Sequence, residues 1–215
     1  APDTEGEPAY RQEKAPGDSF DRPSPLRLAE GGRFLRGTLT HALLEHLPHV
    51  PPEKRETAAA AFIERRGAGL STATRTSIVK EALAVLTDPA FAPIFGPDSR
   101  AEVAIAATLP RPAGAGPALK LNGQIDRLAV LEREVLVVDY KTNRPPPLLV
   151  EAVAPAYLYQ LAAYVLALGE IYPGKQIRAA LLWTDGARLM EVPNAVIQTY
   201  IRQLWDLDPA SLDAP

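Results

Sequence analysis

The chain has 215 residues, a net charge of −3, no cysteine and a hydrophobic content of 47%. This length and composition predict one globular domain with a packed core. The absence of cysteine excludes disulfides, thiolate zinc sites and iron–sulfur clusters, and it is compatible with a reducing cytoplasm. No apolar run is long enough to span a membrane. The mild acidity lacks the basic footprint that usually marks a nucleic-acid-binding domain.

The first 25 residues are rich in proline and acidic side chains, which predicts a flexible linker. They open with APDTEGEPAY, which is polar and does not predict a secretory signal. The chain also lacks an initiator methionine, so we expect it to be part of a longer protein. The folded domain is expected over residues 26–207, with a loose tail over residues 208–215.

Helical periodicity dominates the first half of the expected domain. FLRGTLTHALLEHL (34–47) repeats apolar side chains with helical spacing, and a proline-rich stretch follows it. Two further helices are predicted over residues 53–66 and 72–86, the second capped by Ser71 or Thr72.

The second half alternates between strand and helix patterns. Strands are predicted over 101–109, 118–131 and 134–141, a helix over 155–168, a second hairpin over 176–184 and 187–192 around Asp185-Gly186, and a closing helix over 194–207 capped by Asn194. Helices followed by strands with an inserted helix indicate an α/β domain. Its mixed central sheet is flanked by helices, with a helical segment at the N-terminus.

One predicted hairpin brings acidic side chains together. If its turn is centred on Glu132-Arg133, Asp126 faces Asp139 on the neighbouring strand. Asp139 and Lys141 share a face because side chains along a strand alternate with a period of two. A slip of one residue in the register would separate the two carboxylates.

Two opposed carboxylates repel each other, so this pairing needs a compensating charge. A divalent cation such as Mg²⁺, or Mn²⁺ as a substitute, provides that charge and prefers oxygen ligands. A lysine beside the cation can orient a water molecule, which completes the parts needed for phosphodiester hydrolysis. The alternative is a structural Asp–Lys salt bridge at a strand end.

These residues resemble a known family. GQIDRL (123–128) and VVDYKT (137–142) are similar to the core of the RecB-like PD-(D/E)xK nucleases, which have a restriction-endonuclease-like fold. RGTLTHALLEHLP (36–48) resembles the N-terminal helix of that family, which carries a histidine. YQLAAYVLAL (159–168) resembles the glutamine–tyrosine helix that follows the lysine strand.

The resemblance implies roles for the matching residues. Asp126 and Asp139 would bind the metal together with the main-chain carbonyl of Tyr140. His41 would be a further metal ligand, and Lys141 would orient the attacking water.

Other residues would support this site. Gln160 and Tyr164, which share a helix face, would support the lysine or contact DNA. Glu45, one turn after His41, would orient that histidine, and Glu102 is a weaker ligand candidate. Three arginines are either solvated charges or phosphate contacts: Arg36, Arg127 and Arg144.

The stretch DYKTNRPPP specifically resembles the C-terminal nuclease domain of AddA-type helicase–nuclease subunits of alphaproteobacteria. This implies hydrolysis of single-stranded DNA during double-strand-break repair, with helicase domains in the same polypeptide and an AddB-like partner subunit. The chain itself has no G-x-x-x-x-G-K-[ST] motif for ATP. Two alternatives stay open: a nuclease-like module that guides DNA or docks a subunit without activity in isolation, and a small-molecule phosphohydrolase.

Overall fold

The computed structural model describes residues 25–112 and 116–206. The expected tail and all but the last residue of the expected linker lie outside this range. Pro25 begins the first helix. Among the described residues, no helix is both long and apolar enough to cross a membrane.

Three helices form the N-terminal segment, as predicted. They are α1 (Pro25–His46), α2 (Arg55–Arg66) and α3 (Thr72–Thr87). The hydroxyl of Ser71 accepts a hydrogen bond from the backbone N–H of Thr74, which confirms the predicted N-cap of α3. Two short 3₁₀ turns connect α1 to α2, and a third 3₁₀ segment connects α3 to β1.

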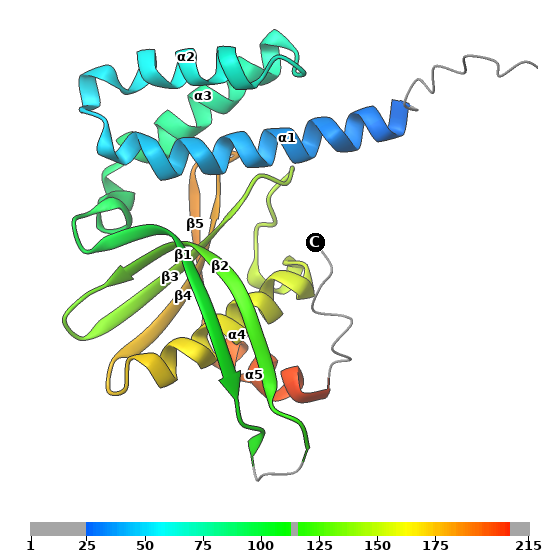
Figure 1. Cartoon of the computed structure of the whole chain (residues 1–215), viewed down its shortest axis with the longest axis vertical. Helices are drawn as coiled ribbons and strands as arrows, with labels where there is room; N and C mark the ends of the chain where they lie inside the picture. The colour runs from blue at the N-terminus through cyan, green and yellow to red at the C-terminus, as the bar shows by residue number, and fades with distance from the viewer. Residues whose placement is uncertain (1–24, 113–115, 207–215) are drawn as a thin grey trace, which may run out of the picture.

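The described residues form a five-stranded mixed sheet in the order β1-β2-β3-β4-β5. The strands are β1 (Ser99–Leu109), β2 (Leu119–Val130), β3 (Glu134–Lys141), β4 (Gln176–Trp183) and β5 (Arg188–Val192). Strands β3 and β4 are parallel and the other neighbours are antiparallel. The parallel connection contains α4 (Pro155–Ile171), and α5 (Asn194–Gln203) follows β5 (Figure 1).

The register of β2 and β3 agrees with the prediction. Its recorded pairs run from Arg127↔Val138 to Val130↔Val135, which centres the turn on residues 132 and 133. The second hairpin also turns at the predicted place, where Gly186 has a φ of +82°. The predicted cap of α5 is wrong. Asn194 is the first helical residue, and Pro193 occupies the cap position without a side-chain bond.

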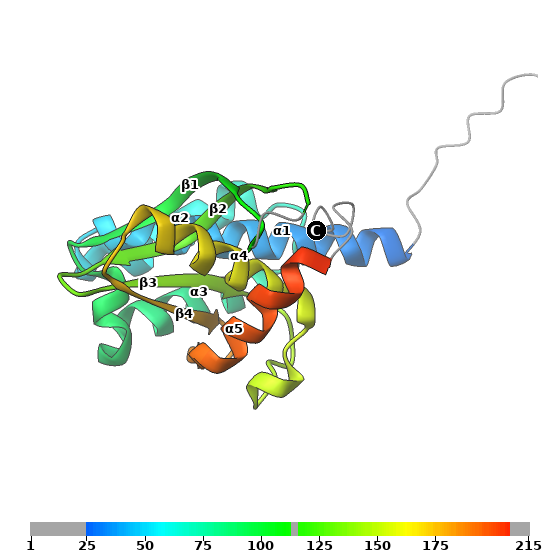
Figure 2. The same ribbon diagram turned by 90° about the horizontal axis from the view of Figure 1, so that it is seen from below.

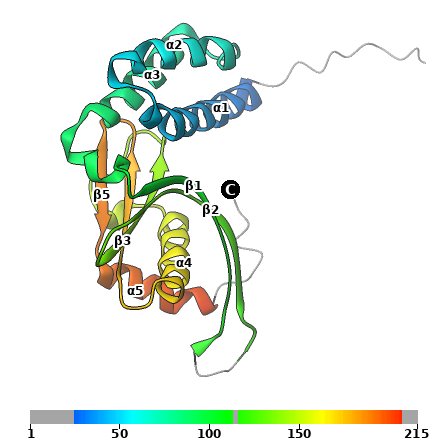
Figure 3. The same cartoon turned by 60° about the vertical axis from the view of Figure 1, so that its left-hand side comes forward.

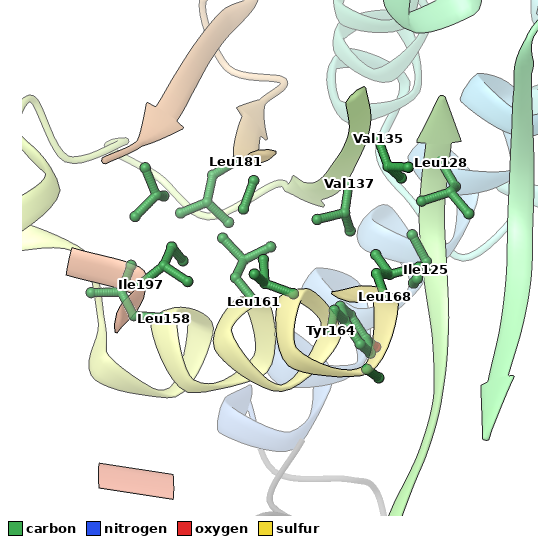
Figure 4. Packing of buried hydrophobic residues seen from close by; sticks show 14 of the residues in the cluster. Ile125, Leu128, Val135, Val137, Leu158, Leu161, Tyr164, Leu168, Leu181 and Ile197 are labelled. Atoms are coloured by element: carbon green, nitrogen blue, oxygen red, sulfur yellow. The ribbon is translucent and has the colours of Figure 1, made fainter. Parts of the chain in front are cut away.

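Helices cover both faces of the sheet (Figures 2 and 3). On one face, Val135 and Val137 of β3 pack with Leu161 and Leu168 of α4 (Figure 4). On the other face, alternate residues of β3 join a second core with buried residues of α1, α2 and α3. Burial on both faces explains why β3 is a continuous apolar run, as is usual for a strand of a covered sheet. The hairpin of β1 and β2 extends past α4 as a curved arm (Figure 3).

Candidate metal centre and active site

The side chain of Asp126 on β2 contacts both α1 and β3. Its Oδ1 lies 3.1 Å from Nδ1 of His41, although 85 residues separate the two in the chain. Its Oδ2 accepts a hydrogen bond of 2.6 Å from the backbone N–H of Tyr140 on β3. Asp126 is one residue beyond the last recorded β2–β3 pair, and its carboxylate continues the link between the strands. Both oxygens are therefore fixed in direction by the fold.

Glu102 of β1 completes a group that could hold a cation. One ligand atom each from Glu102, His41 and Asp126 lie within 4.8 Å of one another. Glu102 has a φ of +51°, and the recorded β1–β2 pairs skip it. A positive φ in a residue other than glycine is unusual and often occurs at functional sites. The sequence pattern indicated Glu102 only as a weaker ligand candidate. The available signal was a glutamate that interrupts the small and apolar side chains of 101–109.

Negative charge dominates this group. Burial raises the pKa of Glu102, and the neighbouring charges of Asp126 and Glu45 raise it further. Burial of His41 opposes its charged form, but the hydrogen bond and charge of Asp126, with the charges of Asp139 and Glu102, raise its pKa above 6.5. The raised pKa values of Glu102 and His41 both indicate that added positive charge is favourable at this place.

Asp139 and Lys141 of β3 form a close pair on the same face of the strand. Their Oδ2 and Nζ atoms are 2.5 Å apart, and both side chains are largely buried. Burial raises the pKa of Asp139 to about 6, with Asp126 adding to the rise and the charge and hydrogen bond of Lys141 opposing it. The lysine therefore offsets only part of the cost of burying the Asp139 charge.

Residues of α4 support the lysine. Lys141 Nζ donates to Oε1 of Gln160 at 3.4 Å, and Nε2 of Gln160 donates to the hydroxyl of Tyr164 at 3.4 Å. The Tyr164 hydroxyl then donates to the backbone carbonyl of Gln124 on β2 at 2.9 Å. Gln160 and Tyr164 therefore lie on one face of α4 that is directed at the lysine, as the helical spacing predicted.

Two other expectations compare differently with the arrangement found. The group of His41, Glu102 and Asp126 does not include Asp139, which is paired with Lys141, so an ion shared by Asp126 and Asp139 stays a prediction. The recorded ionic contact of Glu45 is with His46 at 3.7 Å, while His41 is oriented by Asp126.

The three arginines considered above form ion pairs or lie in the core. Arg144 contacts Glu81 and lies 3.6 Å from Asp185, and Arg36 also binds Glu81. Arg127 is 2% exposed and donates to the Tyr140 hydroxyl and to the Leu44 carbonyl. Both alternatives considered for Arg127 are therefore wrong. Its guanidinium donates to acceptors on Tyr140, Ser99 and Leu44, partners that the local sequence does not reveal.

The donors present fit a divalent cation. Carboxylate oxygens and one imidazole form a set that suits Mg²⁺ or Mn²⁺. Burial raises the pKa of Asp139 even though Lys141 lies against it, so further positive charge at this carboxylate is favourable. A cation held by Asp126 and Asp139, with His41 and the Tyr140 carbonyl as further candidates, would supply that charge.

A mixed sheet with acids and a lysine at the ends of its central strands defines a class of metal-dependent hydrolytic domain. The model of the PD-(D/E)XK nuclease superfamily matches residues 21–207, and the chain belongs to this superfamily. Asp139-Tyr140-Lys141 spells the D-x-K part of that name. The mixed sheet, its flanking helices and the N-terminal helix confirm the predicted restriction-endonuclease-like fold.

Comparison with other proteins adds distant similarities. No curated protein matches the chain. The crystal structure of SSO0001 is 14% identical, with 87% of this chain and 88% of that chain covered and a TM-score of 0.34. The crystal structure of protein VC1899 from Vibrio cholerae is 14% identical, with 86% and 55% covered and a TM-score of 0.28. Similarity at this level does not indicate a shared substrate.

Proposed function

We propose that this domain is a divalent-cation-dependent nuclease that hydrolyses phosphodiester bonds of DNA. The observation that carries the proposal is the buried Asp139–Lys141 pair of β3 beside the carboxylate of Asp126, which is held by the Tyr140 backbone N–H. Burial raises the pKa of Asp139 in spite of the lysine, and a perturbed carboxyl pKa in such a cluster is typical of functional sites.

Each residue has a distinct task in this proposal. Asp126 and Asp139 hold the cation, with His41 and the Tyr140 carbonyl as additional ligands. The bound cation, with Mg²⁺ as the proposed ion and Mn²⁺ as a substitute, would stabilise the charge that develops on the phosphate oxygens. Lys141 orients the water that attacks phosphorus. Gln160 and Tyr164 keep the lysine amine near that water, because they anchor it to the backbone of β2.

We further propose a specific biological setting for this nuclease activity. The resemblance of DYKTNRPPP to AddA-type subunits supports exonucleolytic digestion of single-stranded DNA in a cytoplasmic double-strand-break repair complex. Helicase domains of the same polypeptide would deliver the strand, and an AddB-like subunit would be the partner. The net charge of −3 fits this arrangement, since delivery by other domains reduces the need for a basic surface here.

Cleavage assays on the purified chain test the proposal. We expect wild-type protein to degrade end-labelled linear single-stranded DNA with Mg²⁺ and to leave circular single strands intact, as an exonuclease requires. Lys141→Ala should lower kcat by about 100-fold or more, because it removes a group that acts on the reacting atoms. Lys80→Ala, an exposed lysine on α3, is the matched control and should retain activity.

Two results would contradict the proposal. A wild-type chain that binds no divalent cation and cleaves no DNA, alone or joined to its motor domains, would favour the inactive guiding or docking module. Equal kcat in wild type and Lys141→Ala would remove the lysine from the chemistry.

A further inference from the structure

Tyr157 of α4 contacts the lysine of the candidate active site, and no role has yet been assigned to it. The Nζ atom of Lys141 lies 3.9 Å from the centroid of the Tyr157 ring. A cation over an aromatic face at this distance is attracted by the ring quadrupole. The Lys141 side chain is only 12% exposed, so water screens this attraction weakly.

The ring of Tyr157 is itself held in place. Its hydroxyl donates a hydrogen bond of 3.0 Å to Oδ1 of Asn143, two residues after the lysine. On another side, the ring lies 6.4 Å from the ring of Trp183, with the two planes tilted by 59°. Trp183 is the partner of Lys141 in the β3–β4 ladder. The aromatic face is therefore fixed relative to the strand that carries the lysine.

A divalent cation bound at the carboxylates would weaken some contacts of Lys141 and leave others unchanged. Asp139 is the closest, but a divalent cation on Asp139 would neutralise the charge that attracts the lysine. The hydrogen bond to Gln160 is long, at 3.4 Å. Lys141 contacts the ring face of Tyr157, which is not a metal ligand. The attraction between the Lys141 ammonium and this ring would therefore remain when a cation binds the carboxylates.

We propose that Tyr157 is a positioning residue that holds the Lys141 ammonium over its ring when the cation occupies the carboxylates, with Asn143 fixing the ring. This inference rests on the proposed nuclease function. It adds a residue outside the motifs that indicated that function, and it gives Asn143 a task through the tyrosine hydroxyl.

Substitutions at position 157 separate positioning from folding. Tyr157→Leu should lower kcat by about 2- to 30-fold, the range that a cation–π contact supports. KM for DNA and the affinity for Mg²⁺ in calorimetric titration should stay within about 2-fold of wild type, since the ring touches neither. Tyr157→Phe keeps the aromatic face but loses the hydrogen bond to Asn143, so it should retain more of kcat than Tyr157→Leu. Tyr159→Leu removes a tyrosine of the same helix whose ring packs on Tyr200, and is the matched control for kcat.

Two measurements detect the contact directly. Mono-, di- and trifluorinated phenylalanine at position 157 keep the shape of the ring while weakening its negative face, so log kcat should fall in step with fluorination. In metal-free protein, the ε-methylene protons of Lys141 should show an upfield ring-current shift in the NMR spectrum. This shift should be retained in Tyr157→Phe and lost in Tyr157→Leu.

The outcomes distinguish this inference from the proposed function. Active wild-type protein whose kcat is unchanged by Tyr157→Leu or by ring fluorination would overturn the positioning role and leave the nuclease function intact. A missing ring-current shift would overturn it in the same way. A wild-type chain without cleavage would refute the nuclease function itself, and the positioning role with it.

Discussion

Removal of the Asp139 charge is expected to stabilise the metal-free protein while it abolishes activity. Burial raises the pKa of this carboxyl from 3.8 to about 6, so the folded state binds its proton more tightly than the unfolded state. The stability that this difference contributes is present below about pH 3.8 and is lost as the pH rises through about 6. At 1.36 kcal/mol per pKa unit, ionised Asp139 therefore destabilises the folded domain by about 3 kcal/mol at neutral pH.

Asp139→Asn replaces the ionised group by a neutral one of nearly the same shape. We expect urea unfolding in EDTA to show the variant up to about 3 kcal/mol more stable than wild type at neutral pH. The difference should shrink to about half near pH 5, where wild-type Asp139 is already mostly protonated. Added Mg²⁺ should stabilise wild type more than the variant, because a cation that binds the folded state raises its stability.

The opposite sign would refute this reasoning. If Asp139→Asn unfolds at lower urea than wild type in EDTA at neutral pH, the Asp139–Lys141 pair stabilises the fold. It would then be the structural salt bridge that the sequence left open. Asp88→Asn, an exposed carboxylate that caps a 3₁₀ turn, serves as a control and should not show this gain.

Two further predictions concern other parts of the site. Because the raised pKa of His41 keeps its imidazole protonated to higher pH, Mg²⁺ affinity measured by calorimetry should rise as the pH increases through that pKa. His41→Gln should flatten this dependence, and an unchanged profile would show that His41 does not compete with the cation. Arg127→Met should destabilise the fold by about 2–4 kcal/mol in urea unfolding, since the buried Tyr140 hydroxyl and Leu44 carbonyl lose their donor. A variant as stable as wild type would show that these buried acceptors do not depend on Arg127.

Much of the fold could be predicted from local patterns. The place of the turn between β2 and β3 predicts the register that is found, because a turn centred on residues 132 and 133 decides which residues of the two strands are opposed. The error at Asn194 is local in origin, since asparagine is a common cap but the chain enters α5 from Pro193 with cap geometry and no side-chain bond.

The candidate site was predictable only in part. Spacing alone places Asp139 and Lys141 on one face of β3, and the helical period directs Gln160 and Tyr164 to the same side of α4. Glu102 is the acid that interrupts 101–109, but its grouping with His41 and Asp126 depends on packing between β1, β2 and α1, which local sequence does not specify.

Local side-chain patterns predict the helices and strands, the mixed α/β class, the β2–β3 register and the spacing of the acid and the lysine. These features depend on periodicity and turn signals, which act over neighbouring residues. Packing of distant segments brings His41 to Asp126 and Tyr157 to Lys141, and it places Arg127 in the core and Arg144 in ion pairs. Partners of charged groups are chosen among residues that packing brings together from distant parts of the chain, and local sequence does not specify that choice.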